Sequence, residues 1–198
     1  MQRKNKQKSK FRGSPPGRLR IVAGKWRSRL LPVADVAGLR PTSERVRETL
    51  FNWLSPTIMG ARCLDLYSGT GALGIEALSR GAASVEFVEN SRLATRMLRE
   101  SLRALGATNA VVHEADAAAF LESGCPAPFD TVFIDPPFAT DNYEELCRLL
   151  ASHGWLAKGA QVYLEQDSGQ QVPELPRGWE LLKEKTAGNV RYSLIRAA

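Results

Sequence analysis

The sequence is poor in the residues that metal centres and disulfide frameworks require. It contains three cysteines, at positions 63, 125 and 147, and no two of them form a CxxC pair. Only two histidines, His113 and His153, are present. Such a sparse, odd set of cysteines is typical of free thiols in a reducing compartment. We therefore expect a cytoplasmic protein without disulfides and without a metal site.

Long apolar runs are also missing. No stretch reaches the length of a membrane span, and the basic N-terminus lacks the apolar core of a secretory signal. The 198 residues, with 43% hydrophobic and 24% charged side chains, fit one globular domain with a small appendage. No heptad pattern or apolar extension favours self-association. The sequence thus predicts a monomer that has no membrane partner.

Acidic residues are absent from the first 29 positions, which hold eleven Lys or Arg side chains. The other 169 residues hold 16 basic and 21 acidic side chains, a formal net charge of −5. Because like charges repel and apolar residues are few, residues 1–17 are predicted to form a disordered basic arm. Nucleic acid is its natural partner, since each neutralised phosphate releases counterions. A solubilising tail is the alternative.

After the arm, residues 18–60 read as an appendage to the main domain. Residues 19–33 predict two short strands joined at Gly24-Lys25, and a helix follows that begins at Thr42 or Ser43 as its cap. On this helix Val46, Leu50, Trp53 and Leu54 share one face.

From residue 61 to residue 198, strands alternate with helices. Strands are predicted at 62–67, 84–89, 110–116, 129–135 and 160–166, helices at 72–81, 91–106, 117–123 and 142–154, and a closing hairpin at 179–187 and 190–197. Alternation of this kind predicts right-handed βαβ units. We expect a Rossmann-like α/β fold: a seven-stranded, mostly parallel sheet with an antiparallel C-terminal hairpin.

A glycine-rich loop follows the first of these strands. It contains Gly69-x-Gly71-x-x-Gly74, between a strand and a helix, as the dinucleotide-binding motif requires. Glu89 ends the next strand, where an acid can bind the hydroxyl pair of a ribose. These features fit any cofactor that carries adenosine, so NAD is one candidate.

Asp65 argues against NAD. It lies four residues before Gly69, where a carboxylate would repel a pyrophosphate but attract a cation. S-Adenosyl-L-methionine carries a sulfonium and an ammonium group and no phosphate, so it suits this site better. A buried acid that caps the loop is the alternative for Asp65. Asp116, after the third strand, could accept the adenine amino group, or it could cap the next helix. Tyr67 and Ser68 complete the predicted cofactor site, with loop packing as their alternative role.

The fourth strand ends in Asp135-Pro136-Pro137-Phe138. The first and fourth strands should be neighbours, so Asp135 is expected beside the reactive end of the cofactor. The prolines fix a corner and leave the Pro136 carbonyl outside any regular ladder. A carboxylate and a carbonyl then offer two acceptors to one donor group, and Phe138 offers a flat surface. Asp135, Pro136 and Phe138 are the predicted catalytic residues.

This arrangement suits an exocyclic amino group of a nucleobase. Two acceptors favour the pyramidal form of the amine, whose lone pair can attack the methyl group in line. Guanine presents N1–H and N2–H₂ as adjacent donors, and a carboxylate accepts only, so Asp135 leans weakly toward guanine. The base must leave its stack, and a loop makes this easier than a duplex does.

These residues carry a family resemblance. Asp65, the glycine loop, Glu89 and "DPPF" resemble the class I S-adenosylmethionine-dependent amino-methyltransferases. With "RIVAGKWRSRLLPV", "LRPTSERVRETLFNWL" and "LDLYSGTGALGIEALSRGA", the chain resembles, over about residues 18–196, the bacterial 16S ribosomal RNA guanine-N2 methyltransferases of the RsmD type. The resemblance implies methylation of one loop guanine of 16S ribosomal RNA, conventionally position 966, on an assembled or partly assembled small subunit. It implies nothing for the basic arm.

Contacts with the RNA are expected from the segment before the glycine loop and from the proline corner. The predicted RNA-binding residues are Arg40, Thr42, Arg45, Arg47, Pro137 and Phe138. For Arg45 and Arg47, solvated positions on an ordinary helix are an equal alternative. Three other functions stay open: an NAD-dependent oxidoreductase, an amino-methyltransferase that acts on DNA or protein, and a non-catalytic RNA-binding assembly factor.

Overall fold

The computed structural model describes residues 17–33, 42–124, 127–137 and 142–198. The predictions made for the arm up to residue 16, for Arg40 and for Phe138 lie outside these ranges. No helix in the described ranges is both long and apolar enough to cross a membrane.

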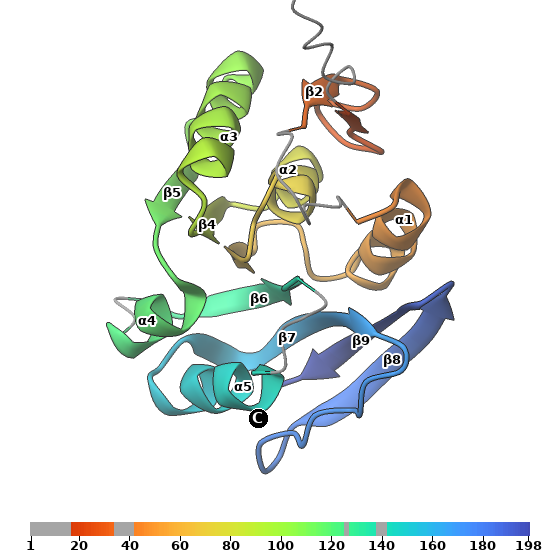
Figure 1. The fold of residues 1–198 in the computed structure, drawn as a ribbon, viewed down its shortest axis with the longest axis vertical. Helices are drawn as coiled ribbons and strands as arrows, with labels where there is room; N and C mark the ends of the chain where they lie inside the picture. The colour runs from red at the N-terminus through yellow and green to blue at the C-terminus, as the bar shows by residue number, and fades with distance from the viewer. Residues whose placement is uncertain (1–16, 34–41, 125–126, 138–141) are drawn as a thin grey trace, which may run out of the picture.

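A seven-stranded sheet forms the centre of the molecule (Figure 1). Its strands are β3 (Arg62–Leu66), β4 (Ser84–Glu89), β5 (Ala110–Glu114), β6 (Phe129–Ile134), β7 (Leu156–Asp167), β8 (Glu180–Ala187) and β9 (Val190–Arg196). They lie in the order β5-β4-β3-β6-β7-β9-β8. In this order the five neighbouring strands β5, β4, β3, β6 and β7 run parallel. Strand β9 pairs antiparallel with both β7 and β8. The predicted mostly parallel sheet with an antiparallel C-terminal hairpin is confirmed.

Five helices cover the two faces of this sheet. They are α1 (Glu44–Trp53), α2 (Ala72–Ser79), α3 (Arg92–Leu105), α4 (Ala117–Glu122) and α5 (Tyr143–Ser152). Helices α1, α2 and α3 lie on one face, and α4 and α5 lie on the other (Figure 1). Side chains along a strand alternate between faces, so Phe133 packs toward α1 and α2 while Val132 and Ile134 pack toward α5.

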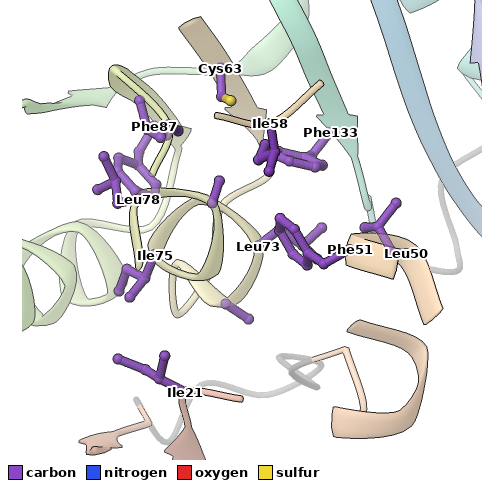
Figure 2. Packing of buried hydrophobic residues seen from close by; sticks show 14 of the residues in the cluster. Ile21, Leu50, Phe51, Ile58, Cys63, Leu73, Ile75, Leu78, Phe87 and Phe133 are labelled. Atoms are coloured by element: carbon purple, nitrogen blue, oxygen red, sulfur yellow. The ribbon is translucent and has the colours of Figure 1, made fainter. Parts of the chain in front are cut away.

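The core layer under α1 and α2 joins the appendage to the sheet. Phe51 of α1 lies 5.9 Å from Phe133 of β6, ring centre to ring centre, and both side chains are fully buried. Figure 2 shows side chains of α1, α2 and the strands meeting in this layer. Because these apolar surfaces are buried against each other, α1 is part of the same core as the sheet and contacts β6 near its carboxyl end.

The N-terminal hairpin differs from its prediction in its turn. Strands β1 (Arg18–Arg20) and β2 (Leu30–Pro32) pair antiparallel as expected, but residues 21–29 connect them instead of a tight turn at Gly24-Lys25. The reason is docking on α2. The backbone N–H groups of Val22 and Ala23 donate to the Glu76 carboxylate at 2.8 and 2.9 Å, and the Lys25 N–H donates to the Ser79 carbonyl at 2.7 Å.

Helix α1 corrects one prediction about its faces. Ser43 is the cap, since its hydroxyl accepts the Val46 N–H at 3.3 Å. Arg47, expected to point away from the core, is 1% exposed and pairs with the equally buried Glu76 at 3.3 Å. Burial lowers the pKa of the Arg47 guanidinium, and the charge of Glu76 opposes that effect. The charged pair is tolerated in the core because each partner is hydrogen-bonded on several sides.

Candidate active site

Four acidic residues meet at the carboxyl ends of four neighbouring strands. Asp65 belongs to β3, Glu89 ends β4, Asp135 follows β6, and Glu165 lies near the end of β7. Asp65 stands opposite Phe133, and Ile134 stands opposite Leu164. Asp135 directly follows Ile134, and Glu165 directly follows Leu164. Because side chains alternate between faces along a strand, Asp65, Asp135 and Glu165 all lie on the face of Phe133, which α1 and α2 cover.

These carboxyl groups lack basic partners. None of the four forms an ion pair with any residue in the described ranges. Burial, joined by the charges of Asp135 and Glu89, raises the pKa of Asp65 to about 8. Burial raises the pKa of Asp135 to about 6, although the residue as a whole stays partly exposed. Binding of a cation in this site is favourable, because the positive charge stabilises the ionised form of the buried carboxyl groups.

The glycine loop is braced by two of these acids. The Glu89 carboxylate accepts the Gly69 N–H at 2.8 Å through one oxygen and the Ser91 N–H at 2.7 Å through the other. Asp65 accepts the Gly74 N–H at 2.9 Å. Each carboxylate oxygen has a second lone pair, so these bonds leave acceptor capacity for a ligand.

Two glycines of the loop are required by close packing. Gly71 has φ +75°, and a Cβ there would lie 2.4 Å from Cδ1 of Leu98. A Cβ on Gly74 would lie 2.2 Å from the Phe87 ring and 2.9 Å from the Asp65 carboxylate. The third glycine therefore lets α2 approach β4 and lets its amide reach Asp65.

The remaining predicted cofactor residues have visible structural roles. The Ser68 hydroxyl donates to the carbonyls of Asp65 at 2.6 Å and Val88 at 3.1 Å, which matches loop packing. Tyr67 adopts φ +58° and stays partly exposed. Asp116 caps α4 by accepting the N–H groups of Ala118 and Ala119. Contacts of these residues with a cofactor stay predictions.

At the proline corner, the Thr42 hydroxyl donates to Oδ2 of Asp135 at 2.8 Å. Pro136 is buried and Pro137 is exposed. No hydrogen bond from a donor in the described part of the chain reaches the Pro136 carbonyl, and its contact with a ligand stays a prediction.

Two expected RNA contacts need correction. Thr42 is 5% exposed, and its hydroxyl is engaged by Asp135. The Arg47 side chain is enclosed between α1, α2 and β1, where it donates to the carbonyls of Thr42 and Arg20 as well as to Glu76. Neither side chain is open to RNA in this conformation. Arg45 is exposed and Pro137 is exposed, so both stay candidates.

Glu165 is a site residue that the sequence analysis missed. It is 5% exposed, and the Tyr163 hydroxyl donates to its carboxylate at 2.7 Å. Burial and the charge of Asp135 raise the pKa of Glu165 to about 8. The sequence does indicate a special position for Glu165. In the run "VYLEQ" this acid interrupts an apolar strand, next to the strand that Asp135 follows.

The described residues fit S-adenosylmethionine better than a dinucleotide. The acids without ion-pair partners in the described ranges favour a ligand with positive charge, and Glu89 ends the strand next to the glycine loop, where its carboxylate accepts the Gly69 N–H. A pyrophosphate beside Asp65 would meet a buried carboxyl instead of a cation.

The strand order, the glycine loop and the acid that ends β4 define a class I S-adenosylmethionine-dependent methyltransferase fold. A protein of Streptococcus mutans named as an S-adenosylmethionine-dependent methyltransferase shares the fold, with TM-score 0.72 at 15% identity over 93% of this chain and 56% of that one. The solved structure of yhhF from Escherichia coli, also named as a methyltransferase, matches with TM-score 0.85 and 45% identity, covering 91% of this chain and 98% of that chain.

Sequence comparison gives the family. The family model described as "Conserved hypothetical protein 95" matches residues 19–196. Ribosomal RNA small subunit methyltransferase D of Escherichia coli K12 is 48% identical over 182 residues, which cover 91% of both chains. The chain belongs to this family of methyltransferases. An NAD-dependent oxidoreductase is therefore set aside.

Proposed function

We propose that this protein methylates the exocyclic N2 of one loop guanine of 16S ribosomal RNA, the position conventionally numbered 966, in an assembled or partly assembled small subunit. The similarity to ribosomal RNA small subunit methyltransferase D supports ribosomal RNA of the small subunit as the substrate. The observation that carries the proposal is the corner after β6, where Asp135 is held by Thr42 next to the acid-lined glycine loop. We expect a cytoplasmic monomer.

The acids and the glycine loop would hold the cofactor. Asp65 would attract the ammonium group of the methionine portion, directly or through water, and Glu89 would accept from the ribose hydroxyls. Gly69 and Gly71 adopt φ angles of +53° and +75°, in the left-handed region that glycine favours, which shapes the tight turn beside the proposed cofactor site. S-Adenosylmethionine supplies an electrophilic methyl group on its sulfonium.

Asp135 and the Pro136 carbonyl would bind the two hydrogens of the guanine amino group. Both acceptors favour the pyramidal amine and stabilise the positive charge that develops on N2 during attack. Phe138 would stack on the base. The methylated nitrogen then loses one proton, which passes to the Asp135 carboxylate. Because Asp135 must start ionised, the rate should rise with pH through about 6.

The N-terminal hairpin provides a surface for RNA phosphates. It exposes five basic side chains and contains no acid, and these residues are Arg18, Arg20, Lys25, Arg27 and Arg29. The hairpin packs against α2 and α1, which border the site (Figure 1). RNA bound there would place an unstacked base near the Asp135 corner.

Replacement of Asp135 tests the proposal. Asp135→Asn keeps the shape and one acceptor but removes the charge, so methyl transfer to small subunits should fall by about 10²–10³-fold, as for loss of one preorganised electrostatic group. Affinity for S-adenosylmethionine, measured by calorimetry, should change little. Asp130→Asn at the opposite end of β6, where the carboxylate binds the Arg62 N–H at 2.8 Å, is the matched control and should keep the wild-type rate.

The substrates separate the remaining alternatives. Purified small subunits, free 16S ribosomal RNA and DNA are offered in parallel, and the product nucleoside is identified by mass spectrometry. Methylation of DNA in preference to both RNA forms would replace the proposal with a DNA amino-methyltransferase. Equal rates for Asp135→Ala and wild type would show that the corner is only structural, and RNA binding without any transfer would favour an assembly factor.

A further inference from the structure

A continuous chain of polar contacts runs from the N-terminal hairpin to Asp135. It begins at the backbone N–H groups of Val22 and Ala23, which the Glu76 carboxylate accepts at 2.8 and 2.9 Å. Glu76 pairs with Nη1 of Arg47 at 3.3 Å. Nε of Arg47 donates to the Thr42 carbonyl at 3.2 Å, and the Thr42 hydroxyl donates to Asp135 at 2.8 Å.

Almost every side chain in this chain of contacts is buried. Glu76 and Arg47 are each 1% exposed and Thr42 is 5% exposed. Nη2 of Arg47 also donates to the Arg20 carbonyl of β1 at 2.8 Å. The guanidinium is planar and rigid, so its three contacts fix the position of Thr42 relative to the hairpin and α2 at once.

Thr42 reaches Asp135 with a hydroxyl that donates one hydrogen bond. That bond favours the ionised carboxylate and works against burial, which raises the pKa of Asp135. The other titratable groups that act on this carboxyl are Asp65 of β3, Glu165 and Tyr163 of β7, and Tyr143 of α5. Each of these side chains is acidic or neutral, so in the described part of the chain only Thr42 is seen to hold the charged form of Asp135 by a hydrogen bond.

We propose that Thr42 is a positioning residue for Asp135, and that Arg47 holds Thr42 in register with the docked N-terminal hairpin. Thr42 aims Oδ2 of Asp135 and keeps the carboxylate ionised, while Arg47 acts only through Thr42. The hairpin that offers basic side chains to RNA would thereby set the geometry of the acid that receives the base. The catalytic part of this inference rests on the proposed function, whereas its structural part does not.

The first measurement needs no substrate. Carbon-13 NMR titration of the Asp135 carboxyl, assigned by comparison with Asp135→Asn, reports its pKa in each variant. Thr42→Val keeps the shape but removes the donor, so the pKa of Asp135 should rise above its wild-type value. Thr42→Ser restores a hydroxyl and should return the pKa toward wild type. Thr49→Val removes a hydroxyl that donates to the Arg45 carbonyl within α1, and should leave the pKa unchanged.

The second measurement is methyl transfer to small subunits as a function of pH. Thr42→Val should lower kcat about tenfold, the effect of a misaligned group, with an unchanged KM for S-adenosylmethionine and an acid limb moved to higher pH. Thr42→Ser should recover most of the rate. Absence of transfer by the wild-type protein would contradict the proposed function, while the NMR titration would still decide the role of Thr42.

Arg47→Lys tests the connection to the hairpin. Lysine keeps a positive charge beside Glu76 but cannot span the carbonyls of Thr42 and Arg20 together with that carboxylate. The pKa of Asp135 should shift in the same direction as in Thr42→Val. An unchanged pKa in folded Arg47→Lys would overturn the part of the proposal that concerns Arg47. Unchanged pKa and kcat in Thr42→Val would overturn the whole, and this variant serves where Arg47→Lys does not fold.

Discussion

At the scale of single residues, Asp65 has a structural role and is proposed to bind the cofactor as well. Asp65 is 2% exposed, and its carboxyl accepts the N–H of Gly74 in the first turn of α2. With a pKa of about 8, this carboxyl is mostly protonated at pH 7 before a ligand arrives. A cation placed beside it would lower that pKa and drive the proton off.

Binding of S-adenosylmethionine should therefore release a proton. Calorimetry at pH 7 in two buffers with different ionisation enthalpies should find between about half a proton and one proton released per cofactor. Affinity should increase as the pH rises from 6 to 8, because the free protein then binds fewer protons that the complex must expel. Asp65→Asn should abolish this release and Asp130→Asn should preserve it; an equal release in Asp65→Asn would remove Asp65 from the cofactor site.

Single positions also show what sequence reasoning can reach. Asp65, Glu89 and Asp135 lie at the carboxyl ends of neighbouring parallel strands, as the alternation of strands and helices predicted, while their contacts with a ligand stay predictions. The contacts of Thr42 with Asp135 and of Arg47 with Glu76 were missed, because these partners lie 93 and 29 residues away along the chain. No local pattern pairs a threonine before a helix with an acid after the fourth strand.

At the scale of elements, alternation and capping predicted the sheet and all five helices to within a few residues. Helix α1 shows where the reasoning stopped short. Arg47, Leu50, Phe51 and Leu54 follow the spacing i, i+3, i+4, i+7, which is itself a buried-face pattern. The positive charge suggested a solvated position instead. Glu76 lies within the apolar run "ALGIEAL", and an acid in such a run indicates that a basic residue such as Arg47 is buried beside it.

Docking of the hairpin on α2 depends on the absence of a side chain at Gly24. A Cβ there would lie 1.8 Å from the Ser79 carbonyl oxygen, whereas a Cβ on Gly60 would meet nothing within 4 Å. The two glycines have similar φ angles of +82° and +76°. Alanine should therefore cost the same backbone strain at both positions, about 1–2 kcal/mol, and a further steric cost at Gly24 alone.

Urea denaturation of Gly24→Ala and Gly60→Ala separates the cost of backbone strain, which both variants share, from the steric cost, which arises only at Gly24. We expect the free energy of unfolding to fall clearly more for Gly24→Ala. Equal losses would mean that the hairpin moves off α2 without cost, and the packing of residues 21–29 would then contribute little to stability.

At the scale of the whole molecule, charge is divided between two regions. The hairpin exposes basic side chains, while the carboxyl ends of β3, β4, β6 and β7 carry acids without basic partners among the described residues. An RNA strand can follow the basic region while a cationic cofactor occupies the acidic one. This division fits a reaction between a polyanion and a sulfonium, because each reactant is attracted to its own region.

The basic arm should extend the surface that the N-terminal hairpin is proposed to offer to RNA. The Val33 N–H donates to the Gly17 carbonyl at 3.0 Å, so Gly17 belongs to the hairpin and the arm is best removed as residues 1–16. That segment holds six Lys or Arg side chains and no acid.

Removal of residues 1–16 should weaken binding to small subunits. The logarithm of affinity should also fall less steeply with the logarithm of salt concentration, because fewer counterions are released. Affinity for S-adenosylmethionine should stay unchanged, since the predicted cofactor residues belong to the seven-stranded sheet and the loops that follow its strands. The double variant Lys183→Gln, Lys185→Gln, on the exposed face of β8, controls for a general loss of positive charge and should leave the slope nearly unaltered. If the full-length and shortened proteins show the same slope over 50–200 mM salt, the arm makes no phosphate contacts, and RNA affinity must come from the hairpin and the site alone.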